Sequence, residues 1–461
     1  MEQKYIVALE TGSSKIRGAI GCVDDSGILT VKAVEEERLI DCVRYGCVRN
    51  VGEVSQAITN ILQRLEAREP GRKITGVYTA IGGKSTMLSV CRVERRLPVE
   101  TEVTDEHLRQ LAEEARSTAL AEREIIAVTP RRFSVDKFVT RNPVGTFGES
   151  IEAVYNLVSC KSQLKRNLNN VLSRSNIQVY GRVVRQLAVA DLVLTSEEKR
   201  LGCILVDFGA ETVTVSCYKD GVLRYLATLP MGSRNITLDI TSLHHLEENA
   251  ERLKKTIGTA EPAATDLSID SADYSEINNI IGARVGEIIA NIAEQIKYAD
   301  CTTADFPAGI ILTGGGAKLK GFSSRLEKAT RLKVRIGLPG HNVRMADSRI
   351  QPVDAVDVIA ILAAVAAKGR SCMTEPEPVR EPEPEPEHNH EPVSDRLADN
   401  RRDRRPRFEP EPEDDPLEGL EDDPMPRGRR SSILDKIKVK MARLMEHADD
   451  DGDDDFDELN R

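Results

Sequence analysis

The chain has 461 residues with a formal net charge of −11, and its nine cysteines include no CxxC pair. The length predicts two to four domains with ample core, and the irregular cysteine spacing favours reduced thiols in a cytosolic protein over a disulfide framework or a zinc site. Residues from 371 onward hold 29 acidic against 15 basic side chains, which leaves residues 1–370 nearly neutral, with 46 against 49, and argues against general nucleic-acid binding.

Strand-like runs rich in β-branched residues alternate with helical stretches as far as Arg370. This alternation predicts an α/β fold with covered sheets. No charged and apolar leader opens the sequence, and no apolar run reaches about 18 residues, so we expect neither a signal peptide nor a membrane span.

The first motif is YIVALETGSSKIRGAI at 5–20, which predicts a hairpin whose first strand ends near Glu10. Its turn carries Gly12, Ser13 and Ser14, and the outward N–H groups and hydroxyls of such a turn suit phosphate oxygens. The carboxylate of Glu10 can hold Mg²⁺ through water. Taken alone, a glycine turn between two strands is more often just a hairpin.

Residues 83–160 interrupt the strand-rich N-terminal part and indicate an inserted subdomain. We expect a helix at Asp105–Leu120, with Thr104 as its N-cap, and a turn at the sequence RNPVG. The expected strands are Met87–Val93, Ile125–Ser134 and Ala153–Ser159.

The stretch GCILVDFGAETVTVSCYKDG at 202–221 repeats the first motif, with Asp207 at the strand end, Gly209 in the turn and Thr212 after it. Two such hairpins, one from each of two related halves, would hold a nucleotide phosphate chain from both sides, with Glu10 and Asp207 on the Mg²⁺ side. Glu211 adds a negative charge close to that position, which should slow phosphoryl transfer unless its side chain points away.

The third motif is AGIILTGGGAKLKGF at 308–322, an apolar strand followed by Gly314, Gly315 and Gly316. Residues without side chains would let a base and ribose lie against the backbone. A lone GGG is usually a tight turn, but the three motifs in this order are much harder to obtain by chance.

The composition changes after Arg370. Residues 371–426 hold twelve of the 21 prolines and few apolar anchors, so we expect an extended, solvated linker that spans about 40 Å. The following ILDKIKVKMARLMEHA predicts an amphipathic helix, capped by Ser432, that lies in the interface of an anionic membrane. Its apolar stripe is Ile433, Leu434, Ile437, Met441, Leu444 and Met445, and its basic face is Lys436, Lys438, Lys440 and Arg443.

This helix could instead pack on the protein or on a partner helix. It is followed by eight acidic residues between Asp449 and Glu458. Such a run is usually a solvating tail, and a sharper hypothesis is that it competes with lipid for the basic face.

The chain resembles the FtsA family of bacterial cell-division actin homologues over residues 4–369 and again in the tail. The resemblance rests on VALETGSSKI, RNPVG, LAVADLVLTSEEKRLGCILVDFG, NITLDI, AERLKKTIG, ARVGEI and GIILTGGGAKLKGF. It implies an actin-like two-lobed ATPase fold with an inserted subdomain 1C. The implied division is subdomain 1A at 1–82, 161–202 and 341–370, insert 1C at 83–160, subdomains 2A and 2B at 203–340, a linker at 371–430, a membrane-targeting helix at 431–447 and an acidic tail at 448–461.

The resemblance also implies ATP and Mg²⁺ as ligands. The implied ATP-binding residues are Gly12, Ser13, Ser14, Lys15, Asp207, Gly209, Thr212, Glu251, Lys254, Arg284, Gly314, Gly315 and Gly316. Glu251 and Lys254 would bracket adenine and ribose, while Arg284 could equally be a surface arginine. No catalytic residue is assigned: Gln186 lies in the region where the attacking water is oriented, yet a glutamine that opens a helix is usually structural. We therefore expect slow hydrolysis at most, and no metal ligated directly by protein.

The implied role is to self-associate, bind the C-terminal peptide of the tubulin-like FtsZ through subdomain 2B near residues 235–300, and recruit later division proteins at the septum. The implied location is the cytoplasmic face of the inner membrane. A sugar kinase or chaperone ATPase shares the phosphate loops, but the sequence shows neither an acidic base for a substrate hydroxyl nor a large substrate domain. Another actin-like assembly protein, for pilus assembly or shape determination, is the remaining alternative.

Overall fold

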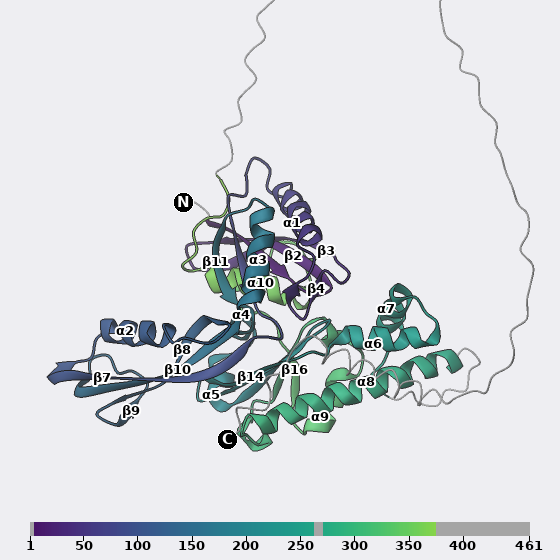
Figure 1. Cartoon of the computed structure of the whole chain (residues 1–461). Helices are drawn as coiled ribbons and strands as arrows, with labels where there is room; N and C mark the ends of the chain where they lie inside the picture. The colour runs from purple at the N-terminus through teal and green to yellow at the C-terminus, as the bar shows by residue number, and fades with distance from the viewer. Residues whose placement is uncertain (1–3, 262–270, 375–461) are drawn as a thin grey trace, which may run out of the picture. The chain divides into compact units, whose positions relative to one another are not determined.

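The computed structural model describes residues 4–261 and 271–374 (Figure 1). The predicted linker, amphipathic helix and acidic tail lie outside the described residues, apart from 371–374. Within the described part of the chain, no helix combines the length and apolarity needed to cross a membrane.

The first sheet has six strands in the order β11-β6-β1-β2-β3-β17. Their bounds are β1 Lys4–Thr11, β2 Lys15–Val23, β3 Leu29–Arg38, β6 Val77–Ile81, β11 Val179–Val184 and β17 Val343–Met345. The strands β1, β2 and β3 are antiparallel neighbours, whereas β6 pairs parallel with β1 and β11 parallel with β6.

Two glycines of β2 show that helices cover both faces of this sheet. A Cβ atom on Gly18 would lie 2.4 Å from Cγ2 of Ile61 on α1 (Val51–Glu66), and one on Gly21 would lie 3.2 Å from Cδ1 of Leu362 on α10 (Val356–Val365). Positions three apart on a strand point to opposite faces, so α1 and α10 lie on opposite sides. The helix α3 (Ser162–Arg174) packs beside α1, and α4 (Arg185–Val193) packs against α10 (Figure 1).

The second sheet has five strands in the order β14-β13-β12-β15-β16. Their bounds are β12 Cys203–Phe208, β13 Val213–Lys219, β14 Val222–Leu229, β15 Ile310–Thr313 and β16 Val334–Ile336. The strands β12, β13 and β14 are antiparallel, while β15 and β16 run parallel to β12. This order and these directions repeat those of β3-β2-β1-β6-β11, so the two sheets are two copies of one unit.

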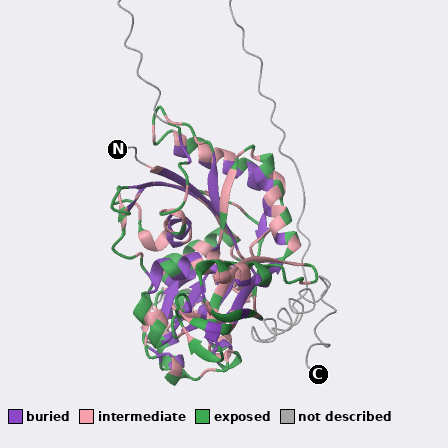
Figure 2. Ribbon diagram, turned by 90° about the vertical axis from the view of Figure 1, so that its left-hand side faces the viewer, coloured by how far each residue is buried: buried purple, intermediate pink, exposed green. Residues whose placement is uncertain are grey.

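Alternation along β12 divides its side chains between two cores. Ile204, Val206 and Phe208 belong to a cluster with helix α8, whereas Cys203 and Leu205 belong to the core that also contains the first sheet. Figure 2 shows the resulting purple, buried strands beneath greener outer helix faces and turns. The remaining helices of this half are α5 Ser196–Leu201, α6 Ser233–Ile240, α7 Glu247–Thr256, α8 Ser271–Tyr298 and α9 Phe322–Thr330.

The insert is a four-stranded antiparallel sheet in the order β7-β10-β8-β9, with one helix packed on it. Its elements are β7 Met87–Glu102, α2 Asp105–Arg116, β8 Arg123–Val135, β9 Phe138–Thr140 and β10 Phe147–Lys161. The predicted helix start and its N-cap Thr104 are confirmed.

Three details of the predicted insert were wrong. The helix ends at Arg116 rather than Leu120, the strands are longer, and β9 was not predicted. β7 continues past Pro98 because this residue lies in a bulge: the register against β10 shifts between Arg96 and Thr101, so no ladder hydrogen bond needs its missing N–H group.

Candidate functional site

The two predicted hairpin turns have the same backbone geometry. The N–H of Gly12 donates to the carbonyl of Lys15 at 3.1 Å, and the N–H of Gly209 donates to the carbonyl of Thr212 at 2.8 Å. Glu10 and Asp207 precede their glycines by two residues and sit at matching positions, opposite Arg17 on β2 and Thr214 on β13. The repeated sequence pattern therefore encodes one turn, built twice.

Arg185, the first residue of α4, brings the two halves together. Its Nη1 donates to Oδ2 of Asp207 at 2.6 Å and to Oδ1 of Asp357, in the first turn of α10, at 3.0 Å. Burial disfavours the guanidinium, yet the attraction of Asp207, Asp357 and Glu10 holds the pKa of Arg185 above its ordinary value. Burial likewise raises the pKa of Asp207, against the opposing attraction of Arg185.

Glu10 is buried, with 4% of its surface exposed, and its Oε2 has no hydrogen-bond partner. The nearest cation is Nη1 of Arg17, at 3.9 Å. Burial, followed by repulsion from Asp357, raises the pKa of Glu10 to about 7. A buried carboxylate oxygen without a partner fits a group that is completed by hydrated Mg²⁺.

No cluster of three histidine, cysteine or acidic side chains within residues 4–261 and 271–374 is arranged to hold a metal ion directly.

Gln186 follows Arg185 and is also buried, and neither atom of its amide has a hydrogen-bond partner. It lies beside Gly82, just after β6, where an added Cβ would be 2.7 Å from its Oε1. An unpartnered buried amide is what a residue that positions a water molecule offers.

Four cations gather near the first turn. Lys15 pairs with Glu36 on β3 at 2.6 Å, and Lys318, just after the glycines of the third motif, pairs with Asp354. Burial lowers the pKa of both lysines, and the positive charges of Arg17 and Lys255 lower them further. The positive charges of these four side chains repel one another, and a bound phosphate chain would neutralise them.

The residues expected on the adenosine side play unequal parts. Lys254 is buried, and its Nζ contacts Oε2 of Glu251 at 2.6 Å, Oγ1 of Thr237 at 2.8 Å and the carbonyl of Ser233 at 2.9 Å. Although burial opposes it, the attraction of Lys254 holds the pKa of Glu251 at about 2. A third of the Glu251 side chain is exposed, so Glu251 is the member of the pair that a ligand can reach. The buried Lys254 fixes its position.

The three glycines also differ. A Cβ on Gly314 would lie 2.4 Å from the carbonyl oxygen of Phe208, and one on Gly316 would lie 2.6 Å from the ring of Phe208, so both are glycines because of packing. A Cβ on Gly315 would meet nothing within 4 Å. Gly315 is thus the one of the three that faces open space.

Arg284 on α8 is engaged inside the protein. Its Nε donates to Oδ2 of Asp239 on α6 at 2.6 Å, and its Nη1 donates to Oε2 of Glu287 at 2.5 Å. It ties α8 to α6, and a base contact would have to be made by the little surface that remains.

The side chain of Glu211 points away from its own turn. Its Oε2 accepts from the backbone N–H of Tyr45, between β4 (Val43–Arg44) and β5 (Cys47–Val48), at 2.8 Å, and its Oε1 lies 3.3 Å from Arg44 and 3.1 Å from Arg234. The added charge is therefore neutralised by residues of both halves.

Sequence reasoning missed Arg185 and Asp357. Asp357 had one signal, since it is the only charged residue of the helix VDVIAILAAV. Arg185 carried no local signal, because its partners lie 22 and 172 residues away.

A family model for cell division protein FtsA matches residues 204–361, and a model for the SHS2 domain inserted in FtsA matches residues 83–159. The chain is 31% identical over 346 residues to a cell division protein FtsA of Porphyromonas gingivalis, covering 71% of this chain and 72% of that protein. It is 25% identical over 382 residues to that of Escherichia coli K12, covering 76% and 88%.

Among solved structures, a PilM-PilN type IV pilus biogenesis complex matches with a TM-score of 0.59 and 16% identity, over 79% of this chain and 98% of that one. These matches confirm the predicted actin-like fold with an inserted subdomain.

Proposed function

The chain belongs to the FtsA family of cell division proteins, and from that membership we propose that it binds ATP between its two halves, self-associates, and tethers FtsZ polymers to the cytoplasmic face of the inner membrane at the division septum. Recruitment of later division proteins is part of the same proposal. The observation that carries it is the duplicated turn, whose two strand-end carboxylates, Glu10 and Asp207, both interact with Arg185.

In this proposal the backbone N–H groups and hydroxyls of the turns at 12–15 and 209–212 bind the phosphates. Lys15 and its three neighbouring cations supply positive charge, and Glu251 and the open backbone at Gly315 receive the ribose and base. Glu10 and Asp207 would hold Mg²⁺ through water, and the bound ion would neutralise charge on the phosphates. Arg185 keeps the two carboxylates from repelling each other.

We propose that hydrolysis is slow at most. Gln186 is the residue that could orient a water molecule, because its amide is buried and without a protein partner. No acidic side chain is assigned as a base. The direction of Glu211 removes one obstacle that the sequence suggested, since its charge is shared with Arg44 and Arg234.

The tethering part rests on the family and on the amphipathic pattern at 431–447, which lies outside the described residues. The proposed FtsZ surface is near residues 235–300, in the region of α6, α7 and α8. A role in pilus assembly or shape determination is the alternative. The pilus complex shares the fold alone, whereas the FtsA relatives match this chain along most of both lengths.

The test is co-sedimentation of FtsZ polymers with anionic liposomes and ATP, using the intact chain and a chain that ends at Pro426. The shorter chain retains every described residue and lacks the predicted helix. We expect FtsZ to pellet with lipid only when the intact chain is present. If FtsZ pellets with neither chain while both bind ATP, the nucleotide site stands and the adaptor function is refuted.

A further inference from the structure

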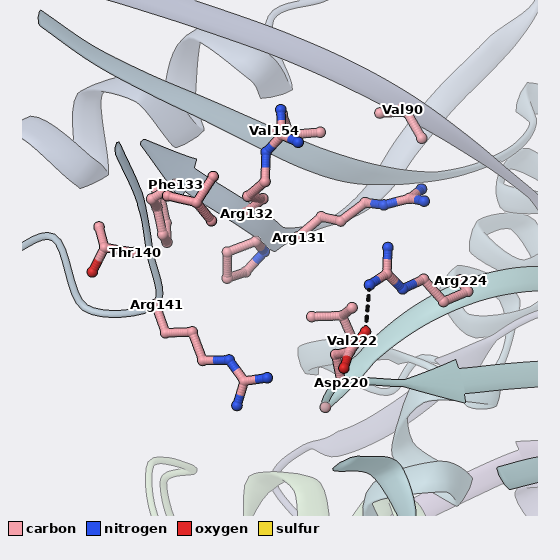
Figure 3. Close-up of a pocket in the computed structure, with 13 residues that line it drawn as sticks. Val90, Arg131, Arg132, Phe133, Thr140, Arg141, Val154, Asp220, Val222 and Arg224 are labelled. Atoms are coloured by element: carbon pink, nitrogen blue, oxygen red, sulfur yellow. Dashed lines mark hydrogen bonds and ion pairs between the residues drawn. The ribbon is translucent and has the colours of Figure 1, made fainter. Parts of the chain in front are cut away.

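A cavity of about 710 Å³ lies between the insert and the turn that joins β13 to β14 (Figure 3). The insert contributes residues of β7, β8, β9 and β10 and the residue after β9. The second half contributes Asp220, Gly221, Val222 and Arg224. The strand β9 ends the sheet of the insert, and β14 ends the five-stranded sheet. The cavity therefore lies beside two sheet edges, which is where proteins accept extended peptides.

The cavity is rich in positive charge, with Arg131, Arg132, Arg141 and Arg224 among its lining residues. Arg132 pairs with Glu152 at 3.2 Å, and Arg224 pairs with Asp220 at 2.9 Å. The side chains of Arg131 and Arg141 have no ion pair or hydrogen bond with any residue in the described ranges.

Figure 3 shows Arg131 extending toward Arg224 and Arg141 entering from the opposite side. Burial lowers the pKa of Arg131, and repulsion from Arg224 and then from Arg132 adds to the effect. Arg131 and Arg141 have no counterion in the described ranges although other arginines line the same cavity, and such charges are stabilised when an anionic ligand binds to them.

Apart from Thr140 and Asp220, the rest of the lining is apolar. Val90 and Val139 leave 55% and 67% of their surfaces exposed, and Phe133, Val154 and Val222 line the same space. Large apolar side chains left in contact with water beside unpaired arginines are typical of a peptide-binding surface with an anchor pocket. A free phosphate would use the arginines and leave this apolar surface uncovered.

We propose that this cavity is a docking site for an acidic peptide segment with one apolar anchor, presented by a partner protein. Carboxylates of the segment would pair with Arg131 and Arg141, and its anchor would cover Val90 and Val139. The site is separate from the nucleotide cleft, and the proposal does not depend on ATP binding.

The test is fluorescence anisotropy of a labelled synthetic peptide, with several aspartates around one phenylalanine, titrated with the full-length chain. We compare wild type with Arg131→Gln/Arg141→Gln. The matched control is Arg116→Gln, which removes an exposed arginine of the same insert that has no ion pair in the described part of the chain and lies outside the cavity. All three chains are first shown to unfold at the same temperature.

We expect the double variant to lose at least about tenfold in affinity and the control to stay within about twofold of wild type. Replacing the phenylalanine of the probe by serine should also weaken binding. Equal affinity for wild type and double variant would overturn the proposal, as would full displacement of the probe by inorganic phosphate at a concentration similar to that of the probe.

Two other occupants are tested in parallel. If anionic vesicles bind the wild-type chain but not the double variant, and the peptide binds neither, the occupant of the cavity is a lipid surface and the peptide proposal is overturned. Probe binding that appears only in a chain lacking Asp449–Arg461 would assign the cavity to the chain's own acidic segment and overturn the proposal of a partner.

Discussion

The buried carboxyl group of Glu10 makes the stability of the nucleotide-free protein depend on pH near neutrality. Burial and Asp357 raise its pKa from 4.5 to about 7 in the folded protein. Each unit corresponds to about 1.4 kcal/mol, so the ionised group destabilises the fold by about 3 kcal/mol. Because the folded pKa is the higher one, the contribution of Glu10 to stability is most favourable below pH 4.5 and is lost as the pH rises through about 7.

Glu10→Gln removes this titration and keeps the size of the side chain. We therefore expect the variant to be more stable than wild type at pH 8 by about 3 kcal/mol, and the difference to widen by about 2 to 3 kcal/mol between pH 5 and pH 8. The assay is urea unfolding of the full-length chain with EDTA and without nucleotide at several pH values.

Glu36→Gln is the control for this experiment. The ion pair with Lys15 outweighs burial and lowers the pKa of Glu36, so its titration lies below this window and its stability curve should run parallel to that of wild type. Parallel curves for Glu10→Gln as well would refute the conclusion that burial and repulsion from Asp357 outweigh the attraction of Arg17 and Arg185 and raise the pKa of Glu10.

Three further predictions concern the same chain. Arg185→Met leaves Asp207 and Asp357 buried without a cation, so we expect a loss of about 3 kcal/mol in urea unfolding at pH 7.5, and a loss below about 1 kcal/mol would contradict the role of this arginine. Gly316→Ala places a methyl group against the ring of Phe208 and should cost about 1 to 3 kcal/mol, whereas Gly315→Ala should be nearly neutral; thermal unfolding distinguishes them, and equal effects would contradict the packing described. Deletion of Asp449–Arg461 should tighten liposome binding by the monomer if the acidic run competes with lipid, and unchanged sedimentation would dismiss that hypothesis.

The duplicated turn shows what could be predicted from the sequence. The carboxylate, the glycine and the strand pattern are local, so Glu10, Gly12, Asp207 and Gly209 could be assigned to two hairpins from the residues alone. The identical strand order of the two sheets supports the same conclusion.

Contacts between distant segments were the part that local patterns could not supply. Arg185 joins Asp357 across 172 residues, and Glu211 meets Tyr45 across 166 residues, so the direction of each side chain depends on how the two halves pack. The separate roles of the glycines at 314–316 could not be predicted from the local sequence either. Their sequence suggested one shared purpose, but Phe208, more than a hundred residues earlier, excludes a side chain at two of them, through its carbonyl at Gly314 and its ring at Gly316.

The central claim is that a nucleotide binds between the two halves, and the most direct measurement is calorimetric titration of Mg²⁺–ATP into wild type and Gly315→Val. A Cβ atom at this position meets no protein atom within 4 Å, so we expect the fold to tolerate the valine while the proposed place of the base and ribose is obstructed. The control is Gly52→Ala on α1, where an added Cβ makes ordinary contacts. We predict that wild type and control bind ATP and that Gly315→Val binds at least about tenfold more weakly. Equal binding by all three, or no binding by wild type, would contradict the account.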